Sequence, residues 1–410
     1  MVNKHKIFIY IFLISLIARL VTAIVYLNFD SQALSMDRQP FLSFTGKNST
    51  NIWEVVGDRD GYNTLASNII TYGGIGDVSW RGPSIPPPLY PIFLAVCYFV
   101  FGFNALAFFI PHIILDSINA ILVLFLSQRI FSSKIGIIAS LFYALNPHFI
   151  VSSIQLYSET LYFFLVLLVF LFCQKLVSGT SSKYVAVNIG IFMALAALCR
   201  SVFLVFIPFI FFWLVKMFYQ EKCRIIVLTA TIFLSFSLVY GVWVIRDHRV
   251  LFAEVSRAAC WHTNWSLFDT NNFGTYNIKY KDQGDAFINW VKENPRQCID
   301  ISLKRLKILL FQPCVNVVSF RHKVVSRFIF FTIYPLGYLG IAKAIRKKNK
   351  IAILILLFIS STIILHALIS IEGELRYRLP VELFISIFAA YGLNAVFGTL
   401  QCAWYNFRRR

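Results

Sequence analysis

The sequence predicts an all-α polytopic membrane protein, a bundle of about ten transmembrane helices with two large extracytoplasmic loops. Of its 410 residues, 58% are hydrophobic and 14% are charged, and the mean hydropathy is +0.70. Soluble domains are about half apolar and about a quarter charged. The apolar residues also gather in segments of about 20, the length a helix needs to cross a bilayer.

Ten segments are long and apolar enough to be expected as spans. The first follows the basic terminus MVNKHK and is too long for the core of a signal peptide, so we expect it to be retained. An eleventh stretch, PLYPIFLAVCYFVFG (89–103), is shorter. The ten expected spans are 7–27, 105–127, 135–155, 158–177, 185–200, 201–219, 224–245, 326–345, 351–371 and 380–400.

Basic residues decide the status of residues 89–103. If this stretch does not cross and the N-terminus is cytoplasmic, every cytoplasmic connection contains Lys or Arg, including AIRKKNK (344–350) and the terminal RRR. Positive residues mark cytoplasmic loops. We therefore expect an interfacial or re-entrant helix at 89–103 and cytoplasmic termini. The net charge of +19 is spread over these connections rather than gathered in one domain, which argues against nucleic acid as a partner.

This topology leaves two extracytoplasmic loops, residues 28–104 and 246–325. In the first, apolar residues at helical spacing predict a surface helix that ends at Gly73–Gly74. In the second, residues 285–311 predict amphipathic helices broken at Asn294–Pro295. The expected division is a transmembrane module at 1–245, the second loop at 246–325 and C-terminal helices at 326–410. The apolar stripe of the first-loop helix comprises Tyr62, Leu65, Ala66, Ile69 and Ile70.

The stretch GDRDGY (57–62) places two carboxylates beside this helix. Asp58 could cap the helix and Asp60 could favour its dipole, or Asp58 could be a general base at the membrane face. DRD also spells the DxD motif of metal-dependent and nucleotide-sugar-dependent transferases. That interpretation is weak, because three residues often match by chance and nucleotide sugars are not expected outside the cytoplasm.

Two charged residues mark the outer ends of neighbouring spans. Glu159 opens the span at 158–177, where it could be a helix-terminal charge or a second carboxylate facing an outer cavity. Arg200 lies between two spans, where it could be an interfacial side chain or a ligand for phosphate oxygens.

Further charges lie within spans or next to them. Arg19 and Asp116 fall inside spans, where ionisable groups are functional or paired, and we favour a structural pair. EGELRYRLP (372–380) is a solvated loop or a grip on an anionic head group by Arg376, Tyr377 and Arg378. Arg246 begins the second outer loop.

The order of these segments resembles the GT-C membrane glycosyltransferases, in the branch of protein O-mannosyltransferases and the lipid A aminoarabinose transferase. The resemblance covers about 7–300 and 326–400. The motifs are D-x-x-x-Y (Asp58, Tyr62), Arg81 and Pro83 followed by LYPIFLA and FG, LDSINAILVLFLSQRIF, a proline-ended span with SETL, ALCRSVF, W-V-I-R and late R-Y-R-L-P.

The resemblance implies a GT-C-like bundle that uses a sugar on a polyprenyl phosphate at the extracytoplasmic face. It implies that Asp58 acts as the base or positions the acceptor, that Glu159 is a second catalytic carboxylate, and that Arg200 lies near the lipid phosphate. Tyr62, Arg81, Arg246 and the 376–378 residues are the further expected binding residues. The family often has an acidic residue where this chain has Arg59, so a divalent metal remains an open expectation.

We therefore expect an inverting glycosyltransferase that moves a sugar to an acceptor hydroxyl or phosphate on a lipid, glycan or protein. The alternatives are a flippase or transporter, and a polymerase, of lipid-linked saccharides. Buried charges fit a transporter, but the chain shows no inverted repeat. The expected location is a bacterial inner membrane.

Overall fold

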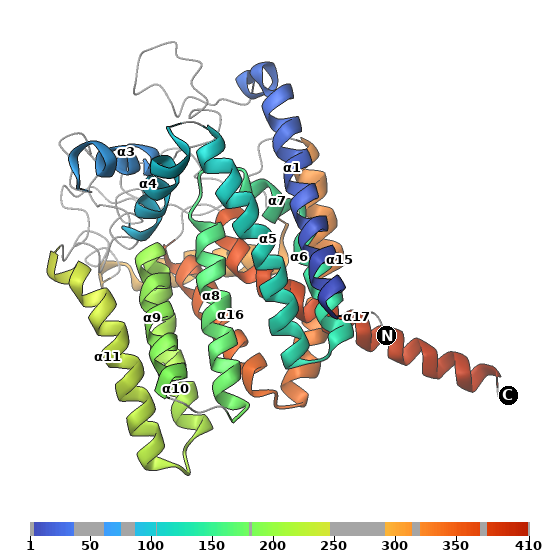
Figure 1. Cartoon of the computed structure of the whole chain (residues 1–410). Coiled ribbons are helices and arrows are strands. Elements are labelled where there is room, and N and C mark those ends of the chain that lie inside the picture. The colour runs from blue at the N-terminus through green and yellow to red at the C-terminus, as the bar shows by residue number, and fades with distance from the viewer. Residues whose placement is uncertain are drawn as a thin grey trace.

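The computed structural model describes residues 4–36, 61–74, 87–103, 105–179, 183–246, 292–313, 320–369 and 375–408, and their regular elements are all helical. Figure 1 shows most of the long helices side by side in one bundle, from which the C-terminal part of α17 projects. The N-terminal half contains α1 (Lys4–Met36), α3 (Tyr62–Tyr72), α4 (Leu89–Phe101), α5 (Ala105–Ile130), α6 (Ser133–Ala144), α7 (Pro147–Ser153), α8 (Glu159–Val177) and α9 (Lys183–Cys199). The remainder contains η1 (Ser201–Phe206), α10 (Ile207–Met217), α11 (Lys222–Arg246), α14 (Pro295–Phe311), α15 (Phe320–Arg346), α16 (Lys350–Ile369) and α17 (Leu375–Arg408).

Seven of the described helices are long and apolar enough to cross a membrane, or eight if the bent pair α6 and α7 forms one span. The two parts of this pair meet at 57°. The expected spans at 185–200 and 201–219 correspond to shorter apolar helices, 183–199 and 201–217, and the stretch at 89–103 is the short helix α4. The all-α membrane fold is thus confirmed, while the total of ten spans stays a prediction.

The basic connections lie together at one end of the bundle. In Figure 1 the turns from α5 to α6, α8 to α9, α10 to α11 and α15 to α16 are all at the end opposite α3. These turns contain Arg129, Lys134, Lys175, Lys183, Lys216, Lys222, Arg224, Arg346 and Lys347. The first-loop helix and the basic connections therefore lie at opposite ends, as the charge pattern predicts.

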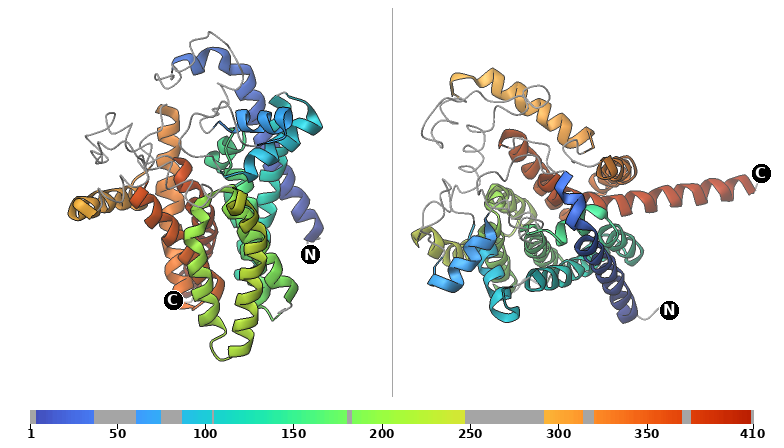
Figure 2. Two further views of the ribbon diagram at one scale, coloured as in Figure 1. Left: turned by 90° about the vertical axis from the view of Figure 1, so that its left-hand side faces the viewer. Right: turned by 90° about the horizontal axis from the view of Figure 1, so that it is seen from above.

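Helix α3 lies across the other end, where Figures 1 and 2 show it beside α4. Glycines at φ 68° and 69° precede and follow α3, because the left-handed region costs glycine little. Within the predicted apolar stripe, Leu65 and Ala66 are buried in the protein and Ile70 is 46% exposed. Helix α3 packs mainly on one neighbour, α4.

Helices α15 and α17 are in backbone contact. A Cβ atom at Gly340 would lie 1.9 Å from the carbonyl oxygen of Phe388, and one at Gly392 would lie 2.0 Å from that of Leu336. No side chain fits at such distances. Small residues of this kind let helices in membranes approach closely and gain van der Waals contact.

Gly392→Ala is expected to destabilise the protein by about 1–3 kcal/mol, because the methyl group forces α15 and α17 apart. Gly398→Ala is the matched control, since the same helix has nothing within 4 Å of that position. Thermal unfolding in detergent measures both variants. Equal melting temperatures for the two would contradict the close contact.

A buried ion pair joins α1 to α5. Arg19 places Nε and Nη2 each 2.5 Å from Asp116 Oδ2, and both residues are at most 1% exposed. Arg19 Nη1 also donates to the Ala144 carbonyl at 3.0 Å, and the Tyr143 hydroxyl donates to Asp116 Oδ1. The structure confirms the predicted Arg19–Asp116 pair and adds the end of α6 to it.

Arg19→Met is expected to cost about 3–5 kcal/mol, because it leaves Asp116 as an uncompensated buried charge. The double variant Arg19→Met, Asp116→Leu should recover a large part of that loss. Equilibrium unfolding in mixed micelles compares the two. A double variant no more stable than the single one would show that charge balance is not the cause.

Candidate functional site

Glu159 is the centre of the candidate site. It is the first residue of α8, at the end of the bundle where α3 lies, and it is fully buried. A carboxylate in the first turn of a helix is favoured by the helix dipole. Burial at this depth still requires a cationic partner, because an isolated carboxylate loses its hydration.

Two guanidinium groups supply the opposite charge. Arg200, which lies between α9 and η1, donates from Nη1 to Glu159 Oε1. Arg376, the second residue of α17, donates from Nε to the same oxygen at 2.6 Å. One carboxylate thus joins α8, α9 and α17. Its other oxygen, Oε2, has no hydrogen-bond partner among the residues that the structure describes.

Aromatic rings support both arginines. The Arg200 guanidinium lies 5.9 Å from the centroid of the Tyr162 ring, and that of Arg376 lies 4.6 Å from the centroid of the Tyr157 ring. Cation–π contacts of this kind stabilise a guanidinium by about 0.5–2 kcal/mol. The rings therefore fix where the two positive groups lie.

The first-loop helix reaches this cluster through Tyr62. Its hydroxyl lies 3.5 Å from Ser158 Oγ, next to Glu159, and its ring meets that of Tyr90 edge-on at 4.6 Å. Tyr90 in turn bonds His112 Nε2 at 2.9 Å. The predicted binding residue Tyr62 is thus beside Glu159, at the end of the segment that contains Asp58.

Two guanidinium groups, those of Arg200 and Arg376, share the single carboxylate of Glu159. A low-dielectric environment strengthens the interactions of such charges. Planar guanidinium groups fit phosphate and carboxylate oxygens. The arrangement is chemically suited to hold an anionic oxygen where α8, α9 and α17 meet, at the end of the bundle where α3 lies.

Arg376 and Arg378, expected to act together, have different neighbours. Arg378 donates from Nη1 to the Gln312 carbonyl at 2.6 Å and lies over the rings of Phe330 and Tyr334. Tyr377 packs against His366, with ring centroids 4.8 Å apart. Residues two apart on a helix do not share a face, which explains the separation.

Other predicted site residues lie elsewhere. Arg19 and Asp116 are joined in the bundle, as described above. Asp58, Arg59, Asp60 and Arg81 lie outside the described residues, and only the backbone of Arg246 is described, at the end of α11. Within the described part of the chain, no three His, Cys, Asp or Glu side chains form a group that could hold a metal ion. Metal use therefore stays an expectation tied to the DRD segment.

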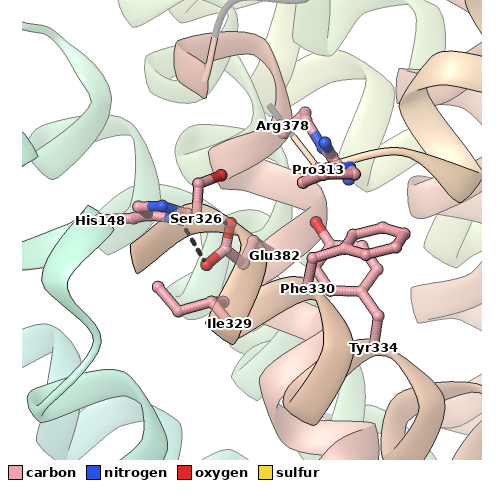
Figure 3. A pocket seen from close by; sticks show the side chains of 8 residues that line it. All are labelled: His148, Pro313, Ser326, Ile329, Phe330, Tyr334, Arg378 and Glu382. Atoms are coloured by element: carbon pink, nitrogen blue, oxygen red, sulfur yellow. Dashed lines mark hydrogen bonds and ion pairs between the residues drawn. The ribbon is translucent and has the colours of Figure 1, made fainter. Parts of the chain in front are cut away.

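Sequence reasoning missed a second polar cluster, of which Figure 3 shows His148 and Glu382. His148 Nδ1 lies 2.9 Å from Oε1 of Glu382, and Asn146 Nδ2 donates to the same oxygen at 2.6 Å. Glu382 falls inside the last expected span. A carboxylate in that position is costly in a membrane, and this was the signal that could have revealed it.

The fold is that of the GT-C membrane glycosyltransferases, and the chain is an integral membrane protein. The oligosaccharyltransferase AglB of Archaeoglobus fulgidus, in complex with an inhibitory peptide and a dolichol-phosphate, matches with a TM-score of 0.57 and 13% identity, over 100% of this chain and 52% of that one. ArnT of Cupriavidus metallidurans, bound to undecaprenyl phosphate, matches with a TM-score of 0.52 and 12% identity, over 84% and 58%. The apo form of the Archaeoglobus enzyme gives 0.55 and 14%, over 98% and 51%.

The chain thus spans between about half and three fifths of the length of these solved proteins. A family described as dolichyl-phosphate-mannose-protein mannosyltransferase matches residues 86–244. No curated protein sequence matches the chain significantly. The predicted resemblance to GT-C glycosyltransferases of the O-mannosyltransferase and aminoarabinose transferase type is confirmed. The family match includes Glu159 and Arg200 and ends before Arg376.

Glu159→Gln is expected to destabilise the protein by about 3–5 kcal/mol, because the buried guanidinium of Arg200 and the partly buried one of Arg376 lose their counter-charge. Glu221→Gln is the control. It removes an exposed partner of Arg224 and should change stability by less than about 0.5 kcal/mol. Unfolding in mixed micelles measures both, and similar effects of the two substitutions would contradict a buried charge cluster.

Proposed function

We propose that the protein transfers a sugar from a polyprenyl-phosphate donor to an acceptor hydroxyl or phosphate. The observation that carries the proposal is the pair of guanidinium groups on Glu159, at one end of a GT-C bundle. Two solved proteins of the same fold contain dolichol-phosphate and undecaprenyl phosphate, respectively. The oxygens of a lipid phosphate suit the planar guanidinium groups of Arg200 and Arg376.

In this proposal Arg200 and Arg376 bind the phosphate and stabilise the charge that it gains as the glycosidic bond breaks. Electrostatic stabilisation of a developing charge is usually the largest contribution to such a rate. Glu159 takes a positioning role in place of the catalytic role expected from the sequence, since Oε1 already accepts from both arginines. It holds the two guanidinium groups next to each other in a fixed orientation.

Asp58 is the proposed base. The acceptor proton passes to its carboxylate while the acceptor oxygen attacks the anomeric carbon and the polyprenyl phosphate leaves. A single displacement inverts that carbon. Tyr62, four residues after Asp58, contacts Ser158 beside Glu159, which supports placing the Asp58 segment near the phosphate.

We further propose that the reaction occurs on the extracytoplasmic face of a bacterial inner membrane, with both termini cytoplasmic. The supporting observation is the gathering of basic connections at the end opposite α3 and Glu159. Cytoplasmic loops are enriched in Lys and Arg. The proposed acceptor is a lipid, a glycan or a protein, and the proposal names no particular sugar.

Native mass spectrometry of the protein in mild detergent tests the donor class. A bound polyprenyl monophosphate, bare or with one sugar, is the expected result. Arg200→Gln and Arg376→Gln should each weaken undecaprenyl phosphate binding about tenfold or more, the loss expected for one charge-assisted hydrogen bond. Arg129→Gln, an exposed arginine at the other end of α5, is the control. A bound polyprenyl pyrophosphate oligosaccharide would instead indicate a polymerase or flippase.

Asp58→Asn is expected to abolish transfer without preventing membrane insertion or lipid-phosphate binding, because the amide cannot accept the proton. Turnover of lipid-linked sugar by membranes that contain the variant measures the effect. Near-normal turnover would reject Asp58 as the base and leave it as a helix cap.

A further inference from the structure

A pocket lies between α7, α15 and α17, apart from the Glu159 cluster. Figure 3 shows side chains from these helices around it, and the space among them, including the part open to solvent, is about 170 Å³. Its polar walls are His148, Glu382, Ser326 and Arg378, and its aromatic walls are Phe330 and Tyr334. Pockets of mixed apolar and convergent polar character are the usual sites of small ligands.

Glu382 holds the imidazole of His148 in one orientation. Nδ1 lies 2.9 and 3.0 Å from the two carboxylate oxygens, and Asn146 donates to one of them. The nitrogen that faces a carboxylate bears the hydrogen, so in the neutral ring Nε2 is an acceptor. Within the described part of the chain Nε2 makes no hydrogen bond.

Arg378 gives the pocket a positively charged wall that can donate hydrogen bonds, unlike the carboxylate of Glu382. It is 5% exposed, and its guanidinium is held over the Phe330 and Tyr334 rings at 5.5 and 5.2 Å from their centroids. Arg378 and Glu382 are four residues apart on α17, so both lie on the same face of that helix. Ser326 adds a hydroxyl from α15.

A structural tie between α7 and α17 accounts for only part of this arrangement. The Asn146–Glu382–His148 contacts join the bend between α6 and α7 to α17. They explain neither the unused Nε2 nor the approach of Arg378 and Ser326 to the same hollow. Those features indicate a ligand.

We propose that this pocket binds a hydroxyl-bearing group, one edge of a sugar ring. A guanidinium donates, a carboxylate accepts, and serine and histidine can do either, depending on the proton position. A hydroxyl group both donates and accepts, so it satisfies such mixed walls, whereas a bare anion would be repelled by Glu382. The space between these walls has room for about one hydroxyl group, the size of a water molecule, so an oligosaccharide does not fit. The identification of the group as a sugar rests on the proposed function.

Saturation-transfer difference NMR on the full-length protein in nanodiscs tests this with free mannose, glucose, galactose, N-acetylglucosamine and arabinose as probes. At least one sugar should receive saturation from the wild type. Its signal should fall at least fivefold in His148→Ala and at least twofold in Ser326→Ala, which leaves the Glu382 contacts in place. Thr332→Ala should have no effect, since that hydroxyl donates to Phe328 within α15.

Undecaprenyl phosphate binding, measured on the same samples, separates this proposal from the transferase proposal. Lipid binding without saturation of any sugar overturns the pocket assignment and leaves the transferase proposal intact. Sugar signals equal in the wild type and both pocket variants also overturn it. Sugar binding that needs His148 without lipid binding supports the pocket and rejects the transferase. If undecaprenyl-phosphate mannose displaces the free sugar, the pocket binds the sugar of the donor. If the signal of the free sugar persists, the pocket binds a sugar of the acceptor.

Discussion

The end of the bundle where α3 lies depends on one interaction, the carboxylate of Glu159 shared by two arginines. One buried oxygen accepts from Arg200 and Arg376, so the neighbouring helices α8 and α9 and the distant helix α17 meet at one atom. A buried carboxylate is tolerated only with such compensation. The same two guanidinium groups are the ones that we propose to bind the lipid phosphate. Stability and proposed function therefore share one electrostatic source.

Elsewhere in the bundle, buried charged side chains are also paired with polar or oppositely charged partners. Arg19 and Asp116 compensate each other between α1 and α5, and Glu382 is satisfied by Asn146 and His148 where α7 meets α17. Between these polar junctions the helices pack through apolar side chains and, at Gly340 and Gly392, through backbone. The polar junctions thus select which helices meet, and the apolar and glycine contacts determine how closely.

Much of the architecture could be predicted from the sequence, because apolar segments of about 20 residues indicate spans and basic loops indicate the cytoplasmic side. The Arg19–Asp116 pair was predictable on the same ground, since each charge in a span needs a partner. The meeting of Glu159 with Arg376 was not, because 217 residues separate them and no local pattern encodes the contact. His148 and Glu382 were missed because one carboxylate in an apolar span was interpreted as part of that span. Asp58 was singled out from its motif, and its place stays a prediction.

The separation of Arg376 from Glu159 along the chain has a consequence for biosynthesis. Glu159 and Arg200 leave the ribosome in neighbouring spans, so a neutral pair can form during insertion of the N-terminal helices. Arg376 and Glu382 arrive with the last helix, after their partners are already in the bilayer. Helix α17 therefore completes two polar junctions at once, and before it inserts, Glu159 can pair with Arg200 but not with Arg376.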